Sequence, residues 1–164
     1  MKPKSKAARP TKKAAKKPAR KPTRKPAKKP AKQQGKWKIL IVDDDPQILE
    51  LYSALLEGAG YAVDQAEHAL AAIASIVRAT PDLILADIRM PIVDGMGLVA
   101  ELKAHTDSQD IPVVAVTGYD SPESRESALK AGYDEYITKP VDPRRFPDQI
   151  AKILVRSRSK RAAK

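Results

Sequence analysis

Short apolar runs that alternate with helix-like segments limit the folds open to this chain. Four such runs lie at 38–42, 82–86, 111–116 and 133–138, and a less apolar one lies at 61–66. Runs of this length that are rich in Ile, Val and Leu are typical of strands buried on both faces of a parallel sheet. The alternation therefore predicts an α/β fold, a doubly wound five-stranded parallel sheet with helices on both faces.

The segments between the runs carry helix start and stop signals. Pro46 and Pro122 stand where a first helical turn tolerates proline, and Ser121 can cap the second of these two helices. Gly58 and Gly132 are placed to end the same helices. The predicted helices cover 46–58, 69–79, 95–105, 121–132 and 143–155.

Charge divides the chain into three parts, which we treat as its predicted domains. Residues 1–36 hold 16 Lys and Arg residues and no Asp or Glu. Residues 37–155 hold 10 basic and 20 acidic residues, and 156–164 add 5 basic ones, which accounts for the formal net charge of +11. We therefore predict a basic tail, an acidic globular domain at 37–155 and a basic C-terminal extension.

The tail is a low-complexity repeat in which Pro18, Pro22, Pro26 and Pro30 recur every four residues between cations. It has almost nothing to bury, so nothing offsets the entropy of ordering it, and we predict disorder. Its charge predicts binding to DNA or another polyanion, with a solubilising spacer as the alternative. The composition resembles the tails of linker histones, which implies sequence-independent contact with DNA. The candidate contact residues are Lys12, Lys13, Lys16, Lys17, Arg20, Lys21, Arg24, Lys25, Lys28, Lys29 and Lys32.

The C-terminal extension holds a second group of cations, among them Arg156, Arg158, Lys160 and Arg161. Two interpretations are equally open for it. The cations either form a second patch for a polyanion, or they belong to a helix end and complement the helix macrodipole.

Several classes of protein are excluded by what the sequence lacks. The absence of cysteine excludes disulfides, thiolate catalysis and Cys-ligated metals. No apolar run approaches the ~18–20 residues of a membrane span, and no hydrophobic segment follows the cationic N-terminus as a secretory signal requires. The glycine patterns of dinucleotide and P-loop sites are also missing. We expect a cytoplasmic protein that the tail could associate with the nucleoid.

Polar residues follow the predicted strands at the point where each strand ends. Asp43 and Asp44 follow the run at 38–42, and Asp87, Thr117 and Lys139 follow later runs. The carboxyl ends of parallel strands meet at one edge of the sheet, where sites form in open α/β folds. Three carboxylates, a hydroxyl and an ammonium would meet there, which is the chemistry needed to hold Mg²⁺ and a phosphoryl group.

Four motifs occur in order at these strand ends. They are Ile-Leu-Ile-Val-Asp-Asp-Asp at 39–45, Asp-Leu-Ile-Leu-Ala-Asp-Ile-Arg-Met-Pro at 82–91 with Asp-Gly at 94–95, Val-Ala-Val-Thr-Gly at 114–118 and Tyr-Ile-Thr-Lys-Pro at 136–140. Each motif alone is a weak signal, but the ordered set resembles the receiver domain of response regulators, the phosphoacceptor module of two-component signalling. The resemblance covers 37–155 and implies a flavodoxin-like fold.

The resemblance implies how the phosphoryl group is taken up. Asp87 would be the phosphoacceptor that attacks a phospho-histidine donor, and Lys139 would neutralise charge during the transfer. Pro140 would follow Lys139 through a cis peptide bond. Asp44 and Asp87 would ligate Mg²⁺ directly together with the backbone carbonyl of Arg89, and Asp43 would act on the ion mostly through water.

The resemblance also implies a switch and two modulating positions. Thr117 would hydrogen-bond the phosphoryl group, and Tyr136 would turn inward behind it. Arg89 and Tyr119 stand at positions that flank the phosphoryl group in the family. A long cation and a phenol can hinder the attacking water, so we predict a long-lived phosphate on Asp87. We interpret Asp45 as the cap of the helix at 46–58.

We therefore expect a phosphorelay response regulator of the chemotaxis type, which catalyses only its own phosphotransfer and dephosphorylation. Its partners would be a sensor histidine kinase or histidine phosphotransfer protein, and a downstream protein that docks on the last two helices and the fifth strand. That face would carry Arg125, Lys130, Arg144 and Arg145. The main alternative is a nucleoid-associated, DNA-binding protein that acts through the tail under receiver control. An enzyme acting on external phosphoesters is disfavoured, because no substrate-binding second domain is evident.

Overall fold

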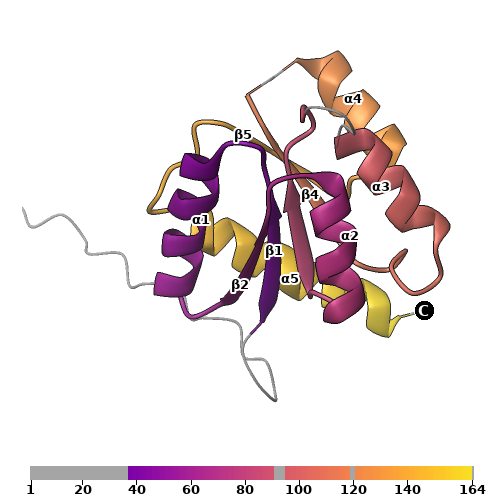
Figure 1. Cartoon of the computed structure of the whole chain (residues 1–164), viewed down its shortest axis with the longest axis horizontal. Coiled ribbons are helices and arrows are strands. Elements are labelled where there is room, and N and C mark those ends of the chain that lie inside the picture. The colour runs from indigo at the N-terminus through magenta and orange to yellow at the C-terminus, as the bar shows by residue number, and fades with distance from the viewer. Residues whose placement is uncertain (1–36, 91–94, 119–120, 164) are drawn as a thin grey trace, which may run out of the picture.

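The computed structural model describes residues 37–90, 95–118 and 121–163, which form a twisted five-stranded sheet with helices on both faces (Figure 1). All neighbouring strands pair in parallel, in the order β2-β1-β3-β4-β5. The strands are β1 (Lys38–Val42), β2 (Ala62–Ala66), β3 (Leu83–Ala86), β4 (Val113–Thr117) and β5 (Glu135–Thr138). The predicted fold class is therefore confirmed.

Helices α1 and α5 cover one face of the sheet, and α2, α3 and α4 cover the other, as the two core clusters show. The helices are α1 (Pro46–Gly58), α2 (Ala69–Arg78), α3 (Gly95–Ala104), α4 (Pro122–Ala131) and α5 (Phe146–Ala162). No helix in the described part of the chain is long and apolar enough to cross a membrane.

The strand pleat divides the apolar side chains between the two faces. Ile39 and Ile41 of β1 pack in the cluster under α1 and α5, whereas Leu40 and Val42 pack in the cluster under α2, α3 and α4. Successive side chains of a strand point to opposite faces, so a strand covered on both faces must be apolar at every position. This explains why the central strands read as continuous apolar runs.

The helix caps predicted from the sequence are present in the structure. Asp45 Oδ1 accepts a hydrogen bond of 2.9 Å from the backbone N–H of Gln47 at the start of α1. Ser121 Oγ accepts one of 3.1 Å from Ser124 N–H at the start of α4. Gly132 ends α4 with a φ of 109°, a left-handed conformation that glycine adopts without steric cost.

Two strands begin later than the sequence indicates. Strand β4 starts at Val113 rather than at 111, because Pro112 has no N–H to donate to the ladder, although its carbonyl accepts from Ile84 N–H at 3.0 Å. Strand β5 starts at Glu135 rather than at 133, because Tyr133 N–H still donates to Ala128 of α4.

The prediction of the last helix was wrong at both ends. Residues 143–145 form a turn, and α5 begins only at Phe146. Pro147 decides this start, because proline inside a helix lacks the N–H that bonds backwards and clashes with the preceding turn. At its other end α5 continues through the predicted extension at 156–164 as far as Ala162.

Candidate functional site

Four strand ends bring the predicted site residues to one edge of the sheet. Asp43 follows β1 and Asp87 follows its neighbour β3, and the backbone N–H of Asp87 donates to the carbonyl of Val42 at 2.9 Å. Thr117 is the last residue of β4, and its carbonyl accepts from the backbone N–H of Lys139, just after β5, at 2.8 Å. These backbone bonds continue the pairing of the strands and so hold Asp43, Asp87 and Lys139 at the strand ends.

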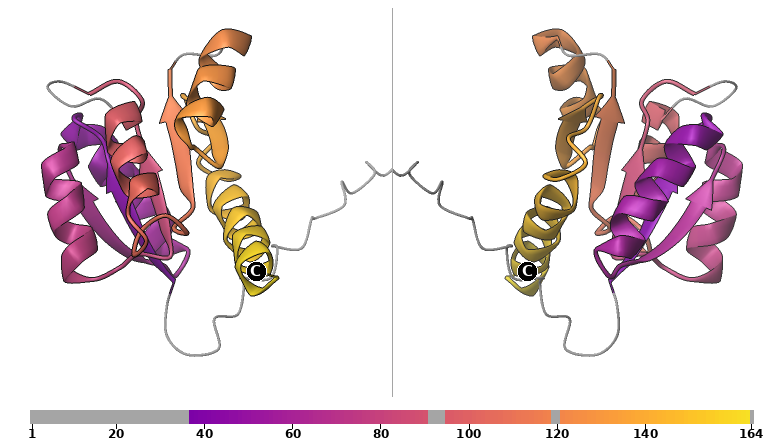
Figure 2. Two further views of the ribbon diagram at one scale, coloured as in Figure 1. Left: turned by 90° about the vertical axis from the view of Figure 1, so that its right-hand side faces the viewer. Right: turned by 90° about the vertical axis from the view of Figure 1, so that its left-hand side faces the viewer.

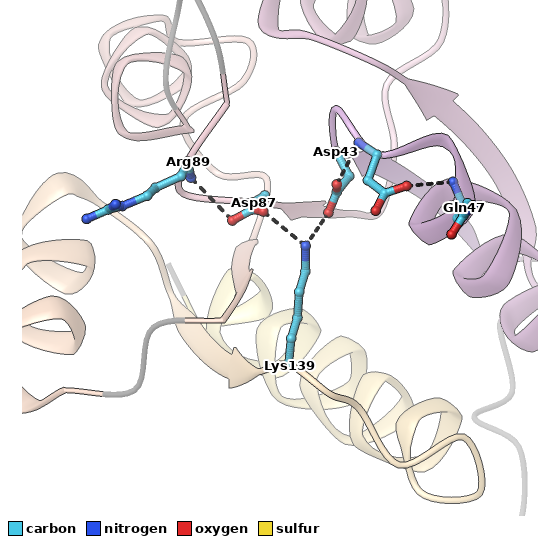
Figure 3. A network of polar contacts seen from close by, with 6 residues as sticks. Asp43, Gln47, Asp87, Arg89 and Lys139 are labelled. Carbon is cyan, nitrogen blue, oxygen red and sulfur yellow. Dashed lines mark hydrogen bonds and ion pairs between the residues drawn. The ribbon is translucent and has the colours of Figure 1, made fainter.

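Lys139 joins the two carboxylates through one ammonium group (Figure 3). Its Nζ donates to Asp43 Oδ2 at 2.6 Å and to Asp87 Oδ2 at 3.0 Å. The side chains of Lys139, Asp43 and Asp87 are 19%, 4% and 14% exposed, so these ion pairs are largely shielded from water. Buried charge pairs persist only when their geometry is good and their other atoms are bonded.

Backbone N–H groups hold the second oxygen of each carboxylate. Asp43 Oδ1 accepts from Asp45 N–H at 3.0 Å, and Asp87 Oδ1 accepts from Arg89 N–H at 3.2 Å. Each carboxylate therefore has one oxygen set by its own loop and the other set by Lys139 (Figure 3). This arrangement fixes the orientation of Asp87 toward the middle of the cluster.

Burial and charge shift the protonation of this cluster in opposing ways. Burial raises the pKa of Asp43 above its usual value, and the hydrogen bonds from Lys139 and the backbone of Asp45 offset this only in part. Burial alone would lower the pKa of Lys139, but its hydrogen bonds to Asp43 and Asp87 raise the pKa overall. The ammonium of Lys139 is therefore held in its charged form by its two carboxylate partners.

A third carboxylate completes an acidic cluster at this edge. Asp43, Asp44 and Asp87 each offer one oxygen, and these oxygens all lie within 4.8 Å of one another. Asp44 is exposed, whereas Asp43 is buried, so the cluster opens to solvent on one side. Such a set of hard oxygen donors around one point fits a small divalent cation such as Mg²⁺.

Gly95 allows helix α3 to begin directly beneath the loop of Asp87. A Cβ atom at Gly95 would lie 2.0 Å from the Asp87 carbonyl oxygen and 2.4 Å from the hydroxyl of Tyr133. The backbone N–H of Gly95 donates to the carbonyl of Ile88 at 2.9 Å. Tyr133 was not among the residues expected here; its buried side chain reaches this loop from the connection between α4 and β5. Only its apolar, β-forming neighbourhood was visible in the sequence.

Thr117 lies beside a hollow of about 250 Å³ next to the cluster. Arg89, Ser124 and Ser127 also line it. Tyr136 lies partly buried on β5 and packs against the core beneath α4. Tyr119 and the tail with its candidate contacts lie outside the described residues, so those predictions stay predictions. Pro91 and Asp94 of the second motif also lie outside them. Lys139 and Pro140 are joined by a cis peptide bond, as expected.

An acidic cluster and a bridging lysine at the carboxyl edge of a five-stranded parallel sheet are the features expected of a receiver domain. Residues 39–151 match the family of the response regulator receiver domain, so the chain belongs to that family. The match lies within the predicted range of 37–155. The predicted identity is therefore confirmed, and the chain is related to the response regulators of two-component phosphorelays.

Curated relatives include transcriptional regulators. The chain is 38% identical over 120 residues to the DNA-binding dual master transcriptional regulator RpaA of Synechocystis sp., covering 73% of this chain and 50% of that protein. It is 39% identical over 119 residues to the phosphate regulon transcriptional regulatory protein PhoB of Pseudomonas aeruginosa, covering 73% and 52%. The chain thus spans about half the length of these relatives.

Solved structures of similar proteins include isolated receivers. A CheY-like receiver domain protein from Methanospirillum hungatei has a TM-score of 0.69 and 37% identity, covering 77% of this chain and 99% of that one. The chemotaxis protein CheY4 of Vibrio cholerae has a TM-score of 0.69 and 27% identity, covering 73% and 99%. In both comparisons about three quarters of this chain matches nearly the whole of the neighbour.

Proposed function

We propose that this receiver accepts a phosphoryl group on Asp87 and passes the signal to a protein partner through its surface. One observation supports the proposal above all others. Lys139 Nζ bridges Asp87 and Asp43 at the carboxyl edge, within hydrogen-bonding distance of both. A carboxylate oriented by a backbone N–H and paired with a largely shielded ammonium is prepared for attack on an electrophile.

In the proposed transfer, a carboxylate oxygen of Asp87 forms a bond to phosphorus. The bond from phosphorus to the imidazole nitrogen of a phospho-histidine breaks, and that nitrogen keeps the electron pair. The ammonium of Lys139 stays near the oxygen of Asp87 and stabilises the negative charge that gathers on the transferring group. The product is an acyl phosphate, which water hydrolyses to restore Asp87. The receiver thus acts only on itself and is not an enzyme for other substrates.

The residues at this edge fit a Mg²⁺ ion. Asp43, Asp44 and Asp87, with the backbone carbonyl of Arg89, would hold it. When bound, the ion would supply positive charge for the oxygens of the incoming phosphoryl group. The closeness of the three carboxylate oxygens supports this assignment, because the single ammonium of Lys139 offsets only part of their mutual repulsion.

The proposed switch uses the hydroxyl at the end of β4 and the ring on β5. Thr117 would bond an oxygen of the phosphoryl group, and Tyr136 would turn inward behind it. The hollow beside Thr117 gives this movement space on the side of α4.

The partners would be a sensor histidine kinase or phosphotransfer protein and a downstream protein that docks on α4, β5 and α5. We also propose that the protein is cytoplasmic. Imaging a fluorescent fusion of the full chain in cells would test this location.

The test is phosphorylation of the full chain by acetyl phosphate with Mg²⁺, read by intact mass. The wild type should gain the mass of one phosphoryl group and lose it on standing, and Asp87→Asn should gain nothing. Asp45→Asn is the matched control, because it removes an adjacent carboxylate while keeping a good helix cap. It should gain the group as the wild type does. No gain in the wild type, or an equal gain in Asp87→Asn, would overturn the proposal.

A further inference from the structure

Helix α2 is apolar on its outer face as well as on the face that packs on the sheet. Of its ten residues only Arg78 carries a charge. Ala69 and Ile76 are buried toward the sheet. On the other side, Leu70 and Val77 are 68% and 83% exposed, the largest values among the exposed large apolar side chains of the described residues. A helix that is apolar all round is normally covered on all sides, so this face is expected to meet another surface.

The exposed apolar positions of α2 follow a helical repeat. Leu70, Ala74 and Val77 are separated by four and three residues, which is the spacing of side chains that line one face of a helix and meet a second helix. Ala74 is itself exposed, and its small side chain lets the backbone of a second helix come close. In both views of Figure 2 α2 lies at one outer side of the domain, across the sheet from α5. We call Leu70, Ala74 and Val77 the α2 stripe.

A hollow of about 660 Å³ lies beside the α2 stripe, between α2 and α3. Figure 1 shows these two helices side by side on the same face of the sheet. Leu70 lies about 10 Å along α2 from Val77 at the edge of the hollow, because a helix rises ~1.5 Å per residue. One surface thus carries both a projecting leucine and an apolar hollow, and such a surface can pair with a copy of itself. The apolar lining of the hollow is Ile73, Ile76, Val77 and Leu102.

We propose that α2 is a contact between two copies of this chain, which pair antiparallel about a twofold axis near residues 73 and 74. In this arrangement Leu70 of each copy meets Val77 and the hollow of the other copy. Each copy supplies one leucine and one hollow, so the interface is closed and self-complementary, as a twofold dimer requires. The pairing does not depend on phosphotransfer to Asp87.

The charges at the two ends of α2 favour the antiparallel arrangement. Glu67 lies just before the cap of α2 and Arg78 is its last residue, and both are exposed. Antiparallel pairing brings Glu67 of one copy near Arg78 of the other at both ends of the contact, whereas parallel pairing would place each charge beside its like. The ion pair of Arg78 with Asp64 spans 3.7 Å and its side chain is 71% exposed, so a second copy can reach it.

The contact should be weak, because α2 is short. Its ten residues extend about 15 Å, which is too little to bury the ~800 Å² per partner of a stable complex. We therefore expect a dimer whose population rises with concentration. The contact leaves the proposed docking face free, because α2 packs on β1 and β2 whereas β5 lies at the opposite edge of the sheet.

The test uses the absence of cysteine from the chain. Ala74→Cys places a single thiol at the centre of the α2 stripe, where the twofold axis brings the two copies together. Ala54→Cys, at an exposed position on α1, is the matched control. Each full-length variant is oxidised at several concentrations, and disulfide-linked dimer is measured on non-reducing gels.

The measured rates are compared after correction for the reactivity of each thiol, which its reaction with a small thiol reagent gives. Ala74→Cys should cross-link at least about tenfold faster than Ala54→Cys, because pairing raises the effective concentration of one thiol near the other. Equal corrected rates would overturn the proposal and leave the α2 stripe for a partner of different chemistry.

Two double substitutions in the Ala74→Cys background separate a specific contact from chance collisions. Leu70→Gln with Val77→Gln removes the apolar contact and should reduce the rate to that of the α1 control. Leu51→Gln with Val155→Gln removes the same side-chain types from exposed positions on α1 and α5 and should leave the rate unchanged. A fast rate that survives the first pair, or equal losses in both pairs, would count against the proposal.

A charge reversal tests the direction of pairing. Glu67→Arg in the Ala74→Cys background places two cations at each end of the contact and should slow cross-linking. Adding Arg78→Glu restores opposite charges only if the helices are antiparallel, and the rate should then recover. A rate that stays slow would exclude the antiparallel arrangement. All the substituted side chains are exposed, and circular dichroism should show that each variant remains folded.

Discussion

The guanidinium of Arg125, on α4, lies over the ring of Tyr136, on β5, with its carbon 5.1 Å from the ring centroid. Arg125 is exposed, and Tyr136 is half-buried against the core. The contact ties the helix on the proposed docking face to the aromatic residue proposed as the switch. A change in the position of Tyr136 should therefore alter the surface that α4 presents to the proposed partner.

Replacing Arg125 with Gln should loosen Tyr136. An exposed cation–π contact contributes roughly 0.5–1 kcal/mol, so its loss should increase the population of other ring positions by about two- to fivefold. Aromatic NMR signals of Tyr136 in the unphosphorylated chain should shift toward those of the phosphorylated one. Lys130→Gln, on the same helix but paired with Glu126, should leave the spectrum unchanged. Identical spectra for both variants would contradict the coupling.

Replacing Lys139 with Met should have opposite effects on ion binding and on phosphotransfer. The three carboxylates and one ammonium sum to a charge of about −2, and removing the ammonium leaves about −3, so Mg²⁺ should bind more tightly. Phosphorylation should slow by at least about 10²-fold, because a charge that stabilises the transferring group is gone. Calorimetric titration with Mg²⁺ and the rate of mass gain measure the two effects. Weaker Mg²⁺ binding would argue against the assigned cluster.

Replacing Gly95 with Ala should destabilise the fold. The new methyl group would lie 2.0 Å from the Asp87 carbonyl oxygen, so the loop or α3 must move. Overpacking of this kind lowers the free energy of unfolding by roughly 1–3 kcal/mol, and urea denaturation measures it. Gly58→Ala is the control, since a Cβ there meets nothing within 4 Å and should not destabilise α1. Equal stability of both variants would show that the loop adapts freely.

Asp64 should contribute stability that acid removes. A hydrogen bond from Lys38, with a smaller one from Ser75, lowers the pKa of Asp64 below its usual value. A carboxyl whose folded pKa is depressed stabilises the fold above its unfolded pKa, and the contribution disappears as pH falls through the folded pKa. Asp64→Asn should therefore lower the free energy of unfolding by about 0.5–1 kcal/mol between about pH 5 and 7. The difference should shrink below about pH 4.

Urea titrations at several pH values measure this difference. Asp107→Asn, the same substitution at an exposed position, is the control with which Asp64→Asn is compared at each pH. A difference for Asp64→Asn that persists unchanged at pH 3 would rule out the proposed linkage.

Arg89 and Tyr119 should slow the loss of phosphate from Asp87. The side chain of Arg89 is exposed beside Asp87 and lines the hollow next to Thr117, where water must enter. Substituting Asn at both positions should accelerate dephosphorylation, measured as loss of the added mass after the donor is removed. Arg144→Asn serves as a control away from this hollow. An unchanged lifetime in the double variant would refute the prediction.

Much of the fold could be predicted because the information is local. The caps at Asp45, Ser121 and Gly132 involve residues within a few positions of one another, and each was found as expected. The start of α5 was misplaced because Pro143 and Pro147 both suit a first helical turn, and only one can occupy it. Its end was misplaced because charge was taken as a boundary, although Arg and Lys favour a helix as strongly as its earlier residues do.

The sequence by itself determined the order of strands and helices and the strand ends at which Asp43, Asp87 and Lys139 stand. Periodicity and turn chemistry act over a few residues, so they can be read from the chain directly. Only the tertiary structure decided that Lys139 bridges two carboxylates, that Arg125 covers Tyr136, that Tyr133 reaches the loop of Asp87, and that Arg158 lies on Trp37. These contacts join residues far apart in sequence, and the packing of helices on the sheet sets their distances.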